Sequence, residues 1–142
     1  MDSLRVQHDD LLAVAKEIEA SLKVEVLRKD AKAIRFRLSK LAGILMVHFS
    51  AEDQWLYPKL SAHADASIAA ISKRCAEEMG GLKDAFGIFM NHWNSTKEIQ
   101  ANAEAFIKDT QRIFAALYHR IDWENRELYP LADRIGLAGF GG

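Results

Sequence analysis

The 142-residue sequence is poor in residues that cross-link or interrupt a chain, with one cysteine, two prolines and eight glycines. A single cysteine excludes an internal disulfide, so the fold does not depend on an oxidising compartment. The scarcity of proline and glycine favours long uninterrupted elements over many turns. A single domain of this size can bury roughly 70% of the surface that its unfolded chain exposes.

The sequence also lacks an excess of charge of either sign. Nineteen lysines and arginines against twenty acidic residues give a formal net charge of −1, which provides no basic field for nucleic acid or an anionic membrane. No apolar run approaches the ~20 residues of a membrane span, and the start, MDSLRVQHDD, lacks the features of a signal peptide. We therefore expect a cytoplasmic protein that binds neither nucleic acid nor membrane.

Four long segments repeat apolar residues at alternating steps of three and four, which is typical of amphipathic helices. The segments begin near Ser3, near Asp30, after Asp65 and at Ser95, and the connections lie at about 24–30, 61–66 and 92–95. Short connections make consecutive long helices antiparallel, so the sequence predicts an all-α, up-down-up-down antiparallel four-helix bundle. We expect one domain at residues 1–135 and a flexible glycine-rich tail at residues 136–142.

Histidines and carboxylates interrupt the apolar stripes of these helices. At a rise of ~1.5 Å per residue they fall in one slab of the core, where an unpaired carboxylate costs several kcal/mol. The candidate metal ligands are His8, His48, Glu52, Glu78, His119 and Glu124. Imidazole and carboxylate together suit Fe, Mn or Zn, so we interpret the slab as a metal site. We place His63 in a loop and His92 at the far end of the bundle, outside the site.

The third and fourth segments leave alternatives open. Glu77, Glu78 or Met79 can be the residue of the third helix that faces the site. In the fourth, Asp122 or Glu127 would replace Glu124 if the helix were rotated. The tyrosines at positions 57, 118 and 129 are interpreted as packing residues.

Two segments echo each other, HFSAEDQWLYP at 48–58 and HRIDWENRELYP at 119–130. Together with an early His8-x2-Leu11, they resemble the hemerythrin-like, or HHE cation-binding, family over nearly the whole chain. The resemblance implies a four-helix bundle with a non-haem, usually di-iron, centre whose chemistry is with O2 or a related small molecule. It places ligands at His8, His48, Glu52, His119 and Glu124, with the two carboxylates as bridges between metals.

The third segment departs from the family pattern, because EEMGGL at 77–82 has Met79 where the family supplies a histidine. Glu78 can ligate instead, which would give three histidines and three carboxylates. Such a harder donor set is nearer to ferritin-like carboxylate sites. It favours oxidation chemistry, iron handling or one empty metal position over reversible O2 carriage.

The first hypothesis is a hemerythrin-like protein that binds two irons. Mn and Zn are the other candidate metals. The protein would bind or react with O2, NO or peroxide in sensing or stress response, and a sensor would act through a separate, unidentified protein partner. The alternatives are an iron-handling or oxidase-type carboxylate protein and a metal-free helical interaction module.

Overall fold

The computed structural model describes residues 1–137, and this part of the chain consists of helices, turns and short connections without a strand. The long helices are α1 (Asp2–Ala20), α3 (Lys32–Ala51), α5 (Ala66–His92) and α7 (Ala103–Trp123). The short ones are α2 (Val24–Lys29), α4 (Tyr57–Ser61), α6 (Thr96–Ala101) and α8 (Tyr129–Arg134). Two π-helical turns, η1 (Glu52–Leu56) and η2 (Glu124–Leu128), link α3 to α4 and α7 to α8. The predicted all-α class is confirmed.

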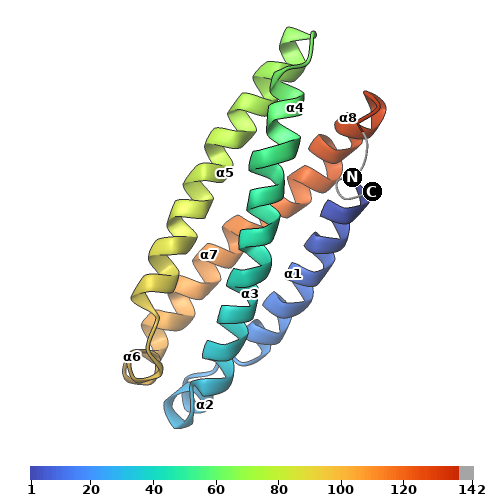
Figure 1. Ribbon diagram of the computed structural model, residues 1–142. Coiled ribbons are helices and arrows are strands. Elements are labelled where there is room, and N and C mark those ends of the chain that lie inside the picture. Colours follow the sequence, from blue (N-terminus) through green and yellow to red (C-terminus); the bar gives the residue numbers. More distant parts are fainter. Residues whose placement is uncertain (138–142) are drawn as a thin grey trace.

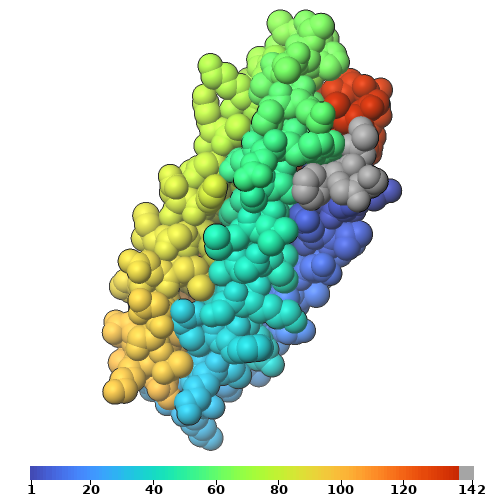
Figure 2. Space-filling model, viewed as in Figure 1, coloured from blue at the N-terminus to red at the C-terminus, as the bar shows by residue number. Residues whose placement is uncertain are grey.

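The long helices lie side by side as a bundle, and those that follow one another along the chain run in opposite directions (Figure 1). Helices α2 and α6 lie at one end, where they contact each other. The segment from α3 through α4 runs along the length of the face shown in Figure 2, between α5 and α1. The connection predicted at 24–30 contains the short helix α2, which buries Leu27. The fourth segment, expected as one helix from Ser95, is instead divided at Asn102 into the short helix α6, which buries Ile99, and the long helix α7.

The core follows the apolar stripes read from the sequence. Fully buried side chains include Leu4, Leu11 and Ile18 in α1 and Leu38 and Leu41 in α3. In α5 the buried face differs from the expected stripe, because Ile71 and Ala85 are exposed whereas Met79 and Phe86 are buried. Complete burial of one such side chain contributes roughly 1.5–3 kcal/mol. The bundle therefore has a continuous apolar core against which a polar site can be held.

Local hydrogen bonds mark several helix ends. The Asp30 carboxylate accepts the Lys32 N–H at 2.9 Å where α3 begins, and Asp65 accepts the Ser67 N–H where α5 begins. Helix α8 ends in a Schellman motif, in which Gly136 has a φ of 79° and its N–H donates to the Asp133 carbonyl. Residues 138–142 of the predicted tail lie outside the described residues.

The π-turns η1 and η2 begin at glutamates and end just before the tyrosines of the two Tyr-Pro pairs. The Tyr57 N–H donates to the Glu52 carbonyl, and the Tyr129 N–H donates to the Glu124 carbonyl. An α-helix places residues five apart about 140° from one another, whereas an i→i+5 turn brings them to one side. Each π-turn thus directs a glutamate and the tyrosine after it into the core.

Candidate metal centre

Four of the predicted ligands meet in the core of the bundle. His8 comes from α1, His48 from the end of α3, and Glu52 and Glu124 from the first positions of η1 and η2. All four side chains are buried, with at most 1% of each residue exposed. The sequence stripes explain this convergence, because each residue occupies an inward position of its own helix.

The outer nitrogen of each imidazole is held by a side-chain amide. His8 Nδ1 lies 2.8 Å from Asn125 Oδ1, and His48 Nδ1 lies 2.8 Å from Gln7 Oε1. An amide oxygen only accepts hydrogen bonds, so Nδ1 carries the proton and donates it. In the neutral ring, Nε2 is then left with a free lone pair, which is the form that binds metals.

These free lone pairs point at one another. His8 Nε2 and His48 Nε2 lie 3.0 Å apart. Glu124 Oε1 is 3.3 Å from His8 Nε2, and Glu52 Oε1 is 3.2 Å from His48 Nε2. Both carboxylate oxygens are buried without a hydrogen-bond partner among the described residues. When both rings are neutral, two imidazole nitrogens and two carboxylate oxygens thus converge without a donor from either ring between them, and a cation would satisfy all four.

Two tyrosines bond the other oxygens of the glutamates in a crossed pattern. The Tyr129 hydroxyl donates to Glu52 Oε2 at 3.0 Å, and the Tyr57 hydroxyl donates to Glu124 Oε2 at 3.5 Å. Each tyrosine therefore contacts the glutamate of the opposite segment. Burial raises the pKa of Tyr129 above its ordinary value, and the charges of Glu52 and Glu124 act in the same direction. Tyr129 consequently remains a phenol and a hydrogen-bond donor.

Without a bound cation, protons compensate the negative charges of the buried carboxyl groups. Burial opposes protonation of His48, but hydrogen bonds and charge from Glu124 and Glu52 raise its pKa to about 9. Burial, followed by the charge of Glu124, raises the pKa of Glu52 to about 8. Burial also opposes ionisation of Glu124, yet hydrogen bonds from Glu52, His48 and His8 lower its pKa. The buried carboxyl pair therefore carries one negative charge near neutral pH, opposite the His48 imidazolium.

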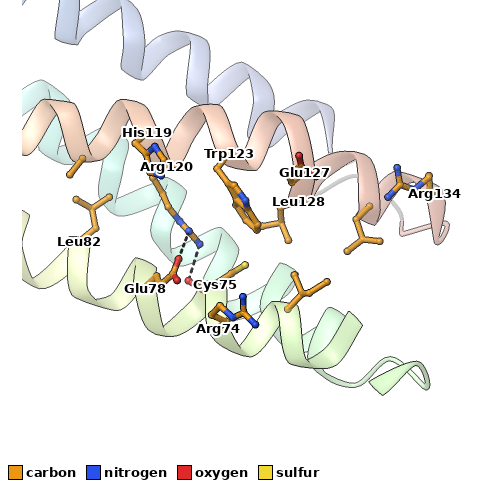
Figure 3. A pocket seen from close by; sticks show the side chains of 13 residues that line it. Arg74, Cys75, Glu78, Leu82, His119, Arg120, Trp123, Glu127, Leu128 and Arg134 are labelled. Atoms are coloured by element: carbon orange, nitrogen blue, oxygen red, sulfur yellow. Dashed lines mark hydrogen bonds and ion pairs between the residues drawn. The ribbon is translucent and has the colours of Figure 1, made fainter. Parts of the chain in front are cut away.

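The structure does not bring the other two predicted ligands to this cluster. His119 is exposed and lines a pocket of about 600 Å³ between α5 and α7 (Figure 3). The side chain of Glu78 is 58% exposed and forms an ion pair with Arg120 at 2.9 Å. The phase of α7 explains the position of His119, because Arg120, four residues before Glu124, is the one that turns inward and is buried. Met79, not either neighbouring glutamate, is the buried residue of that part of α5.

The alternatives for the fourth segment are also resolved by position. Asp122 and Glu127 are exposed, and Asp122 pairs with Arg126 at 2.8 Å. Glu124 alone of these three acidic residues is buried.

Sequence reasoning missed the residues that surround the four converging ligands. Gln7 directly precedes His8 and Asn125 directly follows Glu124, so their positions next to predicted ligands could have identified them. The sequence predicts Tyr57 and Tyr129 as packing residues, although each lies five residues after a glutamate of the repeated segment. Buried Arg120 carried no signal, because arginine is mostly exposed in proteins.

Imidazole and carboxylate donors from several helices meet in the core of this helical bundle, as they do in cation-binding helical proteins. The hemerythrin HHE cation-binding domain matches residues 1–132 of the chain, which therefore belongs to that family. Neither a comparison with curated proteins nor one with solved structures yielded a match. Among the described residues, no helix has both the length and the apolar character needed to span a membrane.

Proposed function

We propose that the chain holds iron between His8, His48, Glu52 and Glu124 and binds or reacts with O2, NO or peroxide in sensing or stress response. The observation that carries this proposal is the convergence of two Nε2 lone pairs and two unpartnered carboxylate oxygens. Mn and Zn suit the same donors. We place this activity in the cytoplasm, with a sensing signal passed to a separate protein partner.

The chain's own residues would prepare the site for a small ligand. Gln7 and Asn125 fix the orientation and tautomer of the two imidazoles. The Tyr129 hydroxyl lies 3.1 Å from His8 Nε2 and 3.4 Å from His48 Nε2, and its hydrogen bond to Glu52 Oε2 holds that carboxyl group in place. A ferrous ion at this position would supply the electron density that binds or reduces a diatomic molecule. Burial of the surrounding side chains limits the access of water.

An oxidase-type or iron-handling role is the second candidate. It is favoured by the donor set, in which two carboxylates and two nearby phenols accompany only two histidines. Such oxygen-rich surroundings stabilise a ferric ion more than an imidazole-rich site does. The two candidates differ in whether oxidation of the metal is reversed when the small ligand is removed.

Metal content and optical spectra would test the proposal. Protein purified without oxygen and supplied with Fe(II) should retain iron through gel filtration, and its spectrum should change on exposure to O2 or NO. A spectral change that reverses when the gas is removed supports binding and sensing, whereas an irreversible change supports the oxidase-type role. Failure to retain Fe, Mn or Zn would contradict both and favour the metal-free helical module.

A pair of alanine variants would locate the ligands. His48→Ala should lose the metal, because it removes one of the two converging Nε2 atoms. His119→Ala is the matched control, since that side chain is exposed and away from the cluster. Metal loss in His119→Ala, with full retention in His48→Ala, would place the site elsewhere.

A further inference from the structure

The centre is built from two halves that correspond by position. Segment α3–η1–α4 supplies Glu52 and Tyr57, and segment α7–η2–α8 supplies Glu124 and Tyr129 at the same spacing of five. The crossed hydrogen bonds from each tyrosine to the opposite glutamate complete the correspondence. The carboxylates and phenols are therefore present twice.

The residues of α1 and α5 that accept hydrogen bonds from these segments also correspond by position. Gln7 accepts from His48, which lies four residues before Glu52. In the other half, Glu78 accepts from Arg120, which lies four residues before Glu124. On this basis Arg120 stands where His48 stands in the first half.

The helices α1 and α5 correspond in the same way. His8 follows Gln7 in α1 and lies three residues before Leu11, and Met79 follows Glu78 in α5 and lies three residues before Leu82. Met79 is buried, as His8 is. The second half thus has a methionine and an arginine at the two positions where the first half has its imidazoles.

Arg120 is fixed in this place by several contacts. Its Nη1 donates to Glu78 at 2.9 Å and its Nη2 donates to the Cys75 carbonyl at 3.0 Å, so its side chain bridges from α7 to α5 (Figure 3). The guanidinium carbon lies 4.9 Å from the centroid of the Trp123 ring, a favourable cation–π distance. Only 8% of the residue is exposed. The guanidinium is permanently charged and offers no lone pair to a metal.

We propose that the centre binds one metal ion, in the half that contains His8 and His48, and that the Arg120 guanidinium occupies the half where a second ion would bind. The inference rests on the proposed metal-binding function. One divalent ion balances the charges of Glu52 and Glu124, whereas a second would face the fixed charge of Arg120 without an imidazole to hold it. The centre would differ in this respect from the pair of irons expected from the family resemblance.

Counting the bound metal would test this inference on the intact chain. Metal-free protein should take up one equivalent of Fe(II) under anaerobic conditions, or of Zn(II) as a redox-inert probe. After oxidation, the iron should give the electron paramagnetic resonance signal of an isolated high-spin ferric ion. Two tightly bound equivalents, with the loss of that signal through coupling, would overturn the inference and leave the proposed function intact. No bound metal would overturn the proposed function itself.

Two variants separate the role of Arg120 from that of Met79. Met79→His combined with Arg120→His restores both imidazoles of the second half and should raise the capacity to two equivalents. Met79→His alone is the matched control and should remain at one, because Arg120 still occupies the position. A double variant that keeps its helical circular dichroism but binds one equivalent would overturn the assignment of Arg120 as the residue that excludes the second ion. If the double variant does not fold, the count for the wild-type chain decides.

Discussion

Replacing Glu52 by glutamine should stabilise the metal-free protein while it weakens metal binding. The Glu52 side chain is fully buried, and its Oε1 lies 3.2 Å from His48 Nε2. Burial and the charge of Glu124 raise its pKa to about 8, so at neutral pH the folded chain must hold a proton on this carboxyl group. An amide of similar shape is neutral without that proton, and its oxygen can still accept the Tyr129 hydroxyl. It offers a metal no charged oxygen.

The size of the effect follows from the linkage between protonation and folding. The folded chain holds the Glu52 proton up to about pH 8, whereas the unfolded chain releases it near the ordinary pKa of 4.5. Between these values the folded state binds more protons, so its stability falls as the pH rises. One pKa unit corresponds to about 1.4 kcal/mol, so the cost accumulated from pH 4.5 to pH 7 is about 3 kcal/mol. Below pH 4.5 both states are protonated and the cost disappears.

Urea unfolding of chelator-treated wild type and Glu52→Gln would measure this cost. We expect the two proteins to have nearly equal free energies of unfolding at pH 4.5, and the variant to be more stable by about 3 kcal/mol at pH 7. Added metal should reverse the order, because a ligand at 1,000 times its Kd stabilises the folded state by about 4 kcal/mol. The variant would lose most of that gain.

Asp53→Asn is the control for this experiment. The Asp53 carboxylate is the next in sequence but is exposed, with Lys83 at 3.1 Å. Exposed pairs of this kind contribute about 0–1 kcal/mol, so we expect a small change at both pH values. A Glu52→Gln variant less stable than wild type at pH 7, or a stability difference that does not vary with pH, would refute the reasoning.

Three further predictions concern the orienting amides, the glycines and the protons of the site. Gln7→Leu and Asn125→Leu each remove the acceptor of an imidazole N–H, so affinity for Zn(II) should fall roughly 10–100-fold in a calorimetric titration. Gly43→Ala and Gly81→Ala place a Cβ in open space on exposed helix surface, and each should raise the free energy of urea unfolding by about 0.5–1 kcal/mol. Metal binding at pH 7 should release protons, because the His48 pKa of about 9 requires deprotonation before coordination. Binding heats that do not depend on the ionisation enthalpy of the buffer would contradict this last expectation.

The long helices could be predicted because their signal repeats along the whole element. Stripes at steps of three and four identify an inward face whatever the neighbouring helices are. The six-residue helix α2 is too short to show such a stripe and buries a single large apolar residue, Leu27. Ile99 of α6 belongs to the stripe of the fourth segment, but that stripe does not reveal the break at Asn102 between α6 and α7. The π-turns carry no propensity signal either, although the repeated Glu-x4-Tyr-Pro marks where they occur.

The site could be predicted only as far as helix phase determines it. His8, His48, Glu52 and Glu124 occupy stripe positions, and they meet in the structure. His119 does not, because residues five apart in an α-helix point about 140° away from each other. A buried arginine four residues before Glu124 requires partners on another helix, here Glu78 and the Cys75 carbonyl. Those partners are 42 and 45 residues away in sequence, which a periodic pattern along one helix does not reveal.

The two halves of the core show how one bundle can tolerate several inward-facing charged and titratable groups. In one half His48 faces two carboxyl groups, and either a proton or a metal ion can compensate them. In the other, Arg120 supplies a charge that cannot be lost, and Glu78 with the Cys75 carbonyl satisfies two of its nitrogens. On the His8 side, the positive charge that compensates the carboxyl groups can be either a proton or a metal ion. On the Arg120 side, the positive charge is permanent. On the proposal of a single metal ion, a cation can be exchanged only on the His8 side, and the ion pair of Arg120 with Glu78 does not depend on metal.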